Sequence, residues 1–376
     1  MKPFRFEILH QSSKSQARVG RIHTPHGIID TPSFVAVGTN GTLKALDNDS
    51  VDAIGLQLMF CNTYHLLVQP GTHIIHKAGG LHAFINRNKP LITDSGGFQV
   101  FSLAYGSVND ELKSRGKKKE SGSVLKITEE GVLFRSYRNG NKILLTPESS
   151  IQAQKELGAD IIIPLDELPP YHVEQDDLKK SLARTHRWEK RSLDAHRSNT
   201  NNQAIYGVIH GGVDPTLRKL SCATLTKEPF DGFAIGGSVG KNRKEMEEMI
   251  SFTSPLLPKE KPIHLLGIGD LPSLKKLIPY GIDTFDSSYP TKAARHGLLL
   301  TKDGGIKITQ GIYATAFRPI EKECRCPTCE SYTLGYLHHL FKANELTGLT
   351  LATIHNLHFM VKLMEETRAQ ILENLI

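Results

Sequence analysis

The 376-residue sequence lacks the features that mark several large classes of protein. It has no apolar run approaching the ~20 residues of a membrane span, and its first residues contain no apolar stretch of signal-peptide length. It also lacks a Gly-x-Gly-x-x-Gly between a strand and a helix, and the lysine motif of phosphate-binding loops. These absences predict a cytoplasmic protein with no membrane partner and no nucleotide cofactor, and they disfavour nicotinamide-dependent and nucleotide-hydrolysing enzymes.

Cysteine and tryptophan are scarce as well, with five Cys and one Trp. Cys61 and Cys222 are solitary, whereas Cys324, Cys326 and Cys329 crowd together, which is poor spacing for a disulfide framework and indicates a metal. Hydrophobic residues at 39% and charged residues at 23% supply enough apolar material for a sizeable core. The net charge of +7 and the pI near 9.0 permit a polyanionic partner without requiring one.

Short apolar runs that end in a polar residue or Gly recur along the chain, usually before a helix-like stretch. Seven are counted, at residues 53–58, 90–93, 161–165, 204–209, 232–235, 263–266 and 282–285. Continuous apolar strands separated by helix-length segments predict a parallel sheet covered on both faces. Seven units over ~290 residues fit an α/β fold of the (β/α)8 TIM-barrel type better than an open sheet. We expect helices over 146–157 and 176–196.

Two regions depart from this rhythm. Residues 112–119 are polar and basic and precede an expected hairpin with its turn at Asn139-Gly140; they form either a solvated loop or a handle for phosphates. The stretch from Cys324 to about His355 resembles a metal-stabilised insertion before a final helix over 349–364. We expect one catalytic domain over 1–376 that includes a zinc-binding subdomain at 318–358.

Three thiolates from one tight turn suit Zn²⁺, which prefers four soft or borderline ligands in a tetrahedron. The fourth ligand must come from elsewhere, and the downstream candidates are His338, His339, His355 and His358. His355 lies on a helical pattern that provides a rigid platform. A closed Cys3His site leaves no position for water, so we expect one structural ion per chain.

Three aspartates, Asp94, Asp166 and Asp286, directly follow or end expected strands. In a barrel these positions converge on the carboxyl-terminal face, where barrel enzymes react. A carboxylate there can act as a nucleophile at a sugar carbon, as a proton donor, or as an acceptor of N–H groups. Glycine pairs at 211–212, 236–237 and 267–269 leave backbone N–H groups open to a ligand, and Phe98 offers an aromatic face.

These residues resemble the bacterial-type tRNA-guanine transglycosylases (queuine tRNA-ribosyltransferases), and the likeness runs from about Phe4 to His358. The matching segments are Asn62 to Leu66, Asp94 to Gln99, Asp166-Glu167, Gly236-Gly237, Asp286 to Thr291, the cysteine group, and Tyr336 to Leu340. The resemblance implies a pentosyltransferase of queuosine biosynthesis that exchanges guanine at the wobble position of tRNA for a free 7-deazaguanine base. It also implies a homodimer and a zinc site completed by His355.

The resemblance assigns roles by motif. Asp286 would be the nucleophile at ribose C1′, forming a covalent intermediate, and Asp94 the general acid/base. The base would be bound by Ser95, Phe98, Asp166, His210, Gly237 and Leu266. Lys292 and Arg295 would contact the tRNA anticodon loop.

Several positions differ from the bacterial pattern. His210 stands where a Gln normally donates to the base, and Lys292 replaces an Arg and loses its bidentate fork. The turn at 236–241 is one residue shorter than usual and carries Lys241 where a Glu is common. A roomier pocket with a cationic neighbour favours queuine over 7-aminomethyl-7-deazaguanine as the incoming base.

Two other functions compete with this interpretation. A retaining barrel glycoside hydrolase would share the paired carboxylates, but it explains neither the zinc ligands nor the single Trp. A non-catalytic RNA-binding family member would lack the nucleophile, whereas Asp94 and Asp286 are both present.

Overall fold

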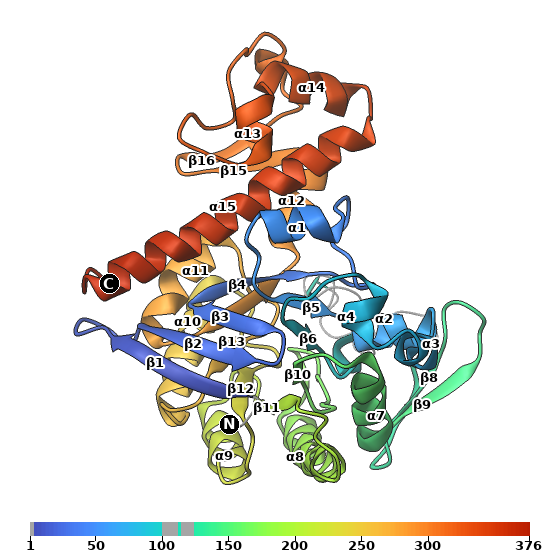
Figure 1. Ribbon diagram of the computed structural model, residues 1–376. Helices are drawn as coiled ribbons and strands as arrows, with labels where there is room; N and C mark the ends of the chain where they lie inside the picture. The colour runs from blue at the N-terminus through green and yellow to red at the C-terminus, as the bar shows by residue number, and fades with distance from the viewer. Residues whose placement is uncertain (1–3, 100–111, 114–123) are drawn as a thin grey trace.

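The computed structural model describes residues 4–99, 112–113 and 124–376. Its centre is a closed barrel of parallel strands in the order β10-β11-β12-β13-β14-β4-β5-β6. The strand bounds are β4 Ser33–Val37, β5 Met59–Cys61, β6 Leu91–Thr93, β10 Ile161–Ile162, β11 Ala204–Ile209, β12 Gly232–Ile235, β13 Ile263–Leu265 and β14 Thr284–Ser287. Helices surround this barrel (Figure 1), which confirms the predicted (β/α)8 fold.

The longest of the described helices that follow the barrel strands is α8, with 23 residues. Their bounds are α1 Asn48–Ala53, α2 Thr63–Val68, α3 Thr72–Lys77, α4 Leu81–Phe84, α7 Pro147–Leu157, α8 Gln175–Arg197, α9 Pro215–Leu225, α10 Arg243–Thr253, α11 Leu271–Leu277 and α12 Tyr289–Arg295, with 3-10 turns at Ser254–Leu256 and Ile278–Tyr280. Both predicted helices are confirmed as α7 and α8. The Thr146 side chain caps α7 by accepting the Ser149 N–H, and Gly158 ends it with φ 73°.

The strand predictions are confirmed for six of the seven apolar runs, within a few residues, and wrong for the first. Residues 53–58 begin at the end of α1 and then turn at Gly55, whose φ of 87° breaks an extended backbone. The strand β5 begins at Met59 instead. Ile54, Leu56 and Leu58 are still buried, so the apolar run marked the core and not a strand. The strand β4 was not predicted.

Two small antiparallel sheets accompany the barrel. The first contains β1 Arg5–Gln11, β2 Arg18–Thr24 and β3 Gly27–Thr31, and its buried Ile22 and Ile29 join the apolar cluster inside the barrel. The second contains β7 Val124–Ile127, β8 Val132–Arg135 and β9 Lys142–Leu145, and the Gly140 φ of 72° confirms the predicted turn. Of the basic segment, residues 114–119 lie outside the described residues.

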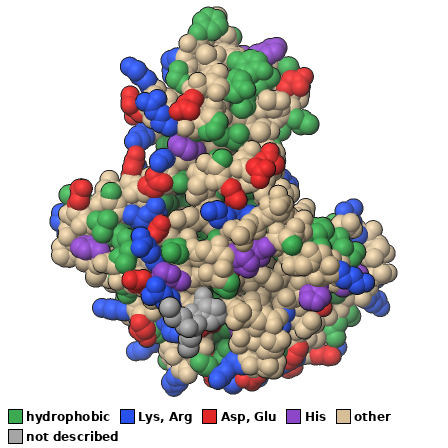
Figure 2. Space-filling view, viewed as in Figure 1, with side chains coloured by type: hydrophobic (Ala, Val, Ile, Leu, Met, Phe, Trp, Pro, Cys, Tyr) green, Lys and Arg blue, Asp and Glu red, His purple; other side chains and the backbone are tan. Residues whose placement is uncertain are grey.

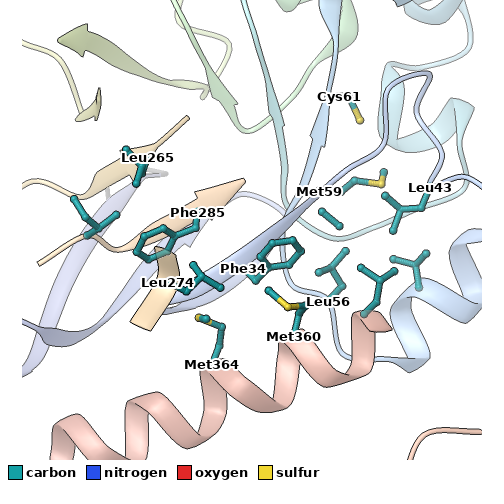
Figure 3. Packing of buried hydrophobic residues seen from close by; sticks show 14 of the residues in the cluster. Phe34, Leu43, Leu56, Met59, Cys61, Leu265, Leu274, Phe285, Met360 and Met364 are labelled. Atoms are coloured by element: carbon teal, nitrogen blue, oxygen red, sulfur yellow. The ribbon is translucent and has the colours of Figure 1, made fainter. Parts of the chain in front are cut away.

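The C-terminal part rises above the barrel in Figure 1 and comprises β15 Leu298–Thr301, β16 Gly304–Lys307, a 3-10 turn at Gly311–Tyr313, α13 Pro327–Ser331, α14 Leu334–Lys342 and α15 Leu346–Leu372. The predicted final helix is confirmed as part of α15, which continues back across the barrel. Met360 and Met364 of α15 point at Phe34 of β4 and at the Phe285 region of β14 (Figure 3). Within the described ranges, no helix combines the length and apolar character that crossing a bilayer needs.

Candidate active site

The residues predicted to be catalytic or to bind the base lie at one end of the barrel. Asp94 follows β6, Asp166 follows β10, His210 follows β11, and Asp286 lies within β14. Gly237 and Leu266 follow β12 and β13. All are at the carboxyl ends of their strands, where parallel strands bring their side chains and loops to one mouth.

Asp94 is a buried carboxylate held by donors from the segment after β5. Its Oδ2 accepts the Asn62 amide at 2.6 Å, and its Oδ1 accepts the Thr63 backbone N–H at 2.8 Å. The Thr63 hydroxyl donates to the Asp94 carbonyl at 2.5 Å, which ties the two loops together. Burial, with a smaller contribution from the nearby Asp166 charge, raises the pKa of Asp94 to about 6, although these donors act to lower it. A group with this pKa can exchange a proton near neutral pH.

Asp166 and His210 are joined across the mouth. The His210 Nε2 lies 2.8 Å from Asp166 Oδ2, and the Ser95 hydroxyl donates to Asp166 Oδ1 at 3.1 Å. Because an ionised carboxylate only accepts, the His210 Nε2 carries the proton in this pair. The structure thus brings together three predicted base-binding residues, and the tautomer is the one that presents an N–H toward the mouth. The His210 donor is already committed to Asp166.

Asp286 is buried, and both of its hydrogen bonds among the described residues end on Oδ1. The Gly267 backbone N–H donates at 2.8 Å, and the His264 Nε2 lies at 3.1 Å. Gly267 has a φ of 73°, which lets its amide turn toward the carboxylate. The carboxylate is therefore held through Oδ1, and no hydrogen bond from a described residue reaches Oδ2.

Arg218 of α9, a fully buried cation, connects the turns after β11 and β12. Its guanidinium donates to the carbonyls of Ile209 and Gly212 at 2.8 Å each and to Ser238 at 3.4 Å. Burial lowers the pKa of Arg218 to about 10. A Cβ at Gly237 would lie 2.8 Å from the His210 ring, so only glycine fits beside that imidazole.

The other two predicted base contacts differ in exposure. Phe98 is 46% exposed on the segment after Asp94. Leu266 is half-buried and packs against the apolar interior of the barrel.

The predicted tRNA contacts lie on α12, immediately after β14. Lys292 is exposed, and Arg295 donates to the Thr291 carbonyl at 2.9 Å. Asn356 of α15 fixes this helix by donating to the carbonyls of Pro290 at 3.0 Å and Leu298 at 2.9 Å. The position of α12 therefore depends on α15.

The Cys3His cluster is formed as predicted, with one ligand atom from each of four residues lying within 4.8 Å of one another. The His355 Nδ1 is 3.8, 3.6 and 3.4 Å from the sulfurs of Cys324, Cys326 and Cys329. The His355 Nε2 donates to the Leu300 carbonyl at 2.7 Å, which leaves the Nδ1 lone pair for a metal. This cluster could hold a metal ion, and its donor set suits Zn²⁺.

The other candidate histidines are placed differently. His338 contacts the Ile308 carbonyl through Nδ1 at 2.7 Å, and His339 stacks on Tyr336. His358, one helical turn after His355, lies 3.6 Å from the Cys324 sulfur.

Sequence reasoning missed several residues that shape the site. Asn62 and Thr63 could have been found, since they directly follow a strand as the aspartates do. Arg218 could not, because a helical Arg in sequence looks solvent-exposed. His264 lies inside an apolar run, and only the folded barrel shows that it contacts Asp286.

A closed (β/α)8 barrel with buried carboxylates at the carboxyl ends of its strands defines a barrel enzyme. A family model described as Queuine tRNA-ribosyltransferase matches residues 12–376. A protein of that name from Protochlamydia amoebophila (strain UWE25) is 70% identical over 376 residues, covering 100% of this chain and 97% of its own length. Another from Chlamydia abortus (strain DSM 27085 / S26/3) is 59% identical over 373 residues, covering 99% of each. The chain belongs to the queuine tRNA-ribosyltransferase family and is a pentosyltransferase, which confirms the resemblance.

Proposed function

We propose that the protein is a tRNA-guanine transglycosylase that exchanges guanine at the wobble position of tRNA for a free 7-deazaguanine base by double displacement. The observation that carries the proposal is the pair of buried carboxylates at the mouth, each held by N–H donors. Family membership supports the tRNA substrate and the queuine-type base. The net charge of +7 suits a polyanionic partner.

In the first half-reaction, Asp286 attacks ribose C1′ and the bond from C1′ to guanine breaks. The bonding pair leaves with the guanine, which takes the proton of Asp94. In the second half-reaction, Asp94 removes a proton from the incoming base, which attacks C1′ and releases Asp286. Two inversions retain the sugar configuration. The pKa of Asp94, about 6, suits a group that must be an acid in one half and a base in the other.

Asp166, His210 and the Gly237 amide bind the edge of the base in this proposal, and Phe98 and Leu266 lie against its ring. Ser95 holds Asp166. His210 donates to the base carbonyl only when it shares or leaves its contact with Asp166, which distinguishes this pocket from one with an amide at the same place. Lys292 and Arg295 contact the anticodon loop from α12.

The decisive variant is Asp286→Asn, which keeps the volume of the side chain and removes the nucleophile. Exchange of labelled guanine into tRNA should fall by at least about 10³-fold, with tRNA affinity retained. A denaturing gel should show a protein–RNA adduct for the parent protein and none for the variant. Unchanged exchange would remove Asp286 from this role and the double displacement with it.

The incoming base is proposed to be queuine. The Lys241 ammonium lies 5.9 Å from the centre of the Tyr171 ring, and the Lys241 backbone N–H donates to the Glu245 carboxylate at 2.7 Å. A cation here disfavours the small cationic aminomethyl base, and the shorter turn at 236–241 leaves room for a bulkier substituent. Exchange assays with each free base decide this. Efficient use of the aminomethyl base with no queuine incorporation would exclude it.

Zn²⁺ is the proposed occupant of the Cys3His cluster, as one structural ion per chain. With all four donors directed at one point, the ion would have no open position and would supply folding stability, not catalysis. We place it within a zinc-binding subdomain at 318–358 of a single catalytic domain.

The proposed quaternary state is a homodimer formed through the region around α14. Large apolar side chains are exposed there, at 73% for Ile312, 81% for Phe317 and 75% for Leu346, and Tyr332 stacks on Tyr336. Figure 2 shows hydrophobic side chains gathered on this upper part of the molecule. Such exposure is typical of an interface. Light scattering of Phe317→Glu should report a monomer; a parent protein that is itself monomeric would exclude the dimer.

A further inference from the structure

We propose that His264 is a positioning residue for Asp286, directing one carboxylate oxygen at the substrate and stabilising the acid as it is released from the sugar. The inference rests on the proposed function, since it concerns the nucleophile of that reaction. It begins from a polar side chain in an apolar place. The strand residues inside the barrel include an apolar cluster, to which Val35, Phe60, Ile92, Val208 and Ala234 belong.

His264 is fully buried at this level of the barrel. Its partner on the next strand is Thr284, which pairs with it in the parallel register of β13 and β14. Its ring stacks on Phe60 with a centroid distance of 6.1 Å and an interplanar angle of 17°. An unpaired polar group in such a place is unfavourable by roughly 1–3 kcal/mol, so a buried imidazole is favoured where its nitrogens form hydrogen bonds.

Both nitrogens of His264 are engaged by β14. Nδ1 lies 2.8 Å from the Thr284 hydroxyl, and Nε2 lies 3.1 Å from Asp286 Oδ1. Thr284 and Asp286 are two residues apart on one strand and so share a face. Since the carboxylate only accepts, Nε2 carries the proton; Nδ1 is then an acceptor, and the threonine hydroxyl donates to it. Thr284, His264 and Asp286 form one directed chain that fixes the ring and its tautomer.

This chain makes the two oxygens of Asp286 unequal. Oδ1 receives both the His264 N–H and the Gly267 N–H, whereas no hydrogen bond from a described residue reaches Oδ2. Oδ2 is therefore the atom that bonds to C1′ as the bond to guanine breaks. In the resulting ester, Oδ1 is the carbonyl oxygen with two N–H donors aimed at it. When the incoming base attacks C1′, the Oδ2 bond breaks and the returning negative charge is stabilised at Oδ1 by these donors.

Loss of the His264 donor should have a specific signature. Removing one such donor lowers rates by about 10²- to 10³-fold. The His264 N–H stabilises the charged Asp286 carboxylate more than it stabilises the neutral ester of the covalent intermediate. Without this donor, the equilibrium between free carboxylate and ester therefore moves toward the ester. We expect kcat to fall far more than KM for tRNA rises, and the fraction of protein trapped as the RNA adduct at saturating tRNA to increase. A purely structural role would lower adduct and rate together.

The test compares His264→Phe, which keeps a flat ring without nitrogen, with His264→Gln, whose amide can donate near the Nε2 position. His264→Phe should lose about 10²-fold in kcat with a raised adduct fraction, and His264→Gln should recover at least a tenth of the parent rate. Phe60→Leu is the matched control, because it alters the packing of the ring and leaves the donor. Equal rates for the Phe and Gln variants, or a lowered adduct fraction in His264→Phe, would overturn the proposal.

If His264→Phe does not fold, Thr284→Val decides the matter, since it removes only the partner of Nδ1. It should lower kcat by about 10-fold with little change in KM, and an unchanged kcat would overturn the proposal. Asp286→Asn separates the two levels of inference. If Asp286→Asn still forms the protein–RNA adduct, the proposed function is wrong. If Asp286→Asn forms no adduct but His264→Phe behaves as the parent protein, only the proposed role of His264 is wrong.

Discussion

The mouth of the barrel and the Cys3His cluster both gather polar side chains in buried surroundings, but they use them in opposite ways. At the cluster, four possible ligand atoms lie within 4.8 Å of one another, and the Leu300 carbonyl accepts a hydrogen bond from the second nitrogen of His355. At the mouth, N–H groups hold Asp94 and Asp286 at their edges, and burial raises the pKa of Asp94 to about 6. At the cluster, the polar atoms have partners, and the arrangement stabilises the fold. At the mouth, the buried carboxylates stay available for reaction, and their burial lowers the free energy of unfolding.

The two regions are connected through α15, which carries His355 toward the cluster and Asn356 toward α12. Leu300 and Leu298 of β15 accept from these two neighbours. The helix α15 therefore links the cluster to α12, the helix after β14, where the proposed tRNA contacts lie.

The largest expected effect on stability comes from breaking the cluster. In Cys329→Ser, bound metal measured by elemental analysis should fall from about one ion per chain to none, and the free energy of unfolding in urea should fall by roughly 5 kcal/mol, since structural zinc contributes to folding directly. Exchange by the protein that remains folded should keep its kcat, with a raised KM for tRNA.

Cys222→Ser is the matched control for this prediction, since Cys222 is a buried thiol on α9, a helix that is not part of the cluster. It should keep the metal. A Cys329→Ser variant that lost kcat without losing stability would reverse the assignment of the two regions.

The second prediction tests whether burial of the Asp94 carboxylate at the mouth lowers the free energy of unfolding. Asp94→Asn removes a carboxylate whose pKa rises from 3.8 unfolded to about 6 folded. A raised carboxyl pKa means that the folded protein binds the proton more tightly, so stability is lost as pH rises through this interval. The full difference corresponds to roughly 3 kcal/mol. At pH 8 the variant should be more stable by up to this amount, with the gain shrinking toward pH 4.

The same variant should lose about 10²- to 10⁴-fold in guanine exchange, because it lacks the proposed proton donor. Urea unfolding at pH 8 and pH 5, alongside the exposed control Asp49→Asn, measures the stability difference. A variant that is less stable than the parent at pH 8 would show that the buried charge is not a burden on the fold.

The sequence predicted the barrel because its strands are apolar on both faces, which makes continuous runs. It misplaced one strand, since Ile54 and Leu56 are buried in a turn and a run alone cannot tell a strand from other buried backbone. It found the aspartates because they directly follow strands. It could not find His264, whose partners Thr284 and Asp286 lie 20 and 22 residues further along the chain. Nor could it find Arg218, whose guanidinium donates to backbone carbonyls at the ends of β11 and β12.

The smallest expected effect comes from a single donor to Asp94. The Asn62 amide favours the ionised carboxylate through its 2.6 Å bond to Oδ2, so Asn62→Ala should raise the pKa of Asp94 above about 6. A hydrogen bond to a charged group contributes about 1.5–3 kcal/mol, which predicts a displacement of roughly one to two pH units. In the proposed mechanism, guanine leaves only when Asp94 is protonated, so kcat/KM falls as the pH rises through the pKa of Asp94. In Asn62→Ala this fall should occur at a pH that is higher by the same amount.

Profiles of guanine exchange from pH 5 to 9 for Asn62→Ala and for the exposed control Asn199→Ala measure this displacement. The control should follow the parent curve, since Asn199 lies in the exposed segment after α8. A profile of Asn62→Ala that coincides with the parent would mean that the donors around Asp94 orient the carboxyl group without setting its proton affinity. The contrast between the mouth and the cluster would then be one of geometry and burial, and the electrostatic part of it would be withdrawn.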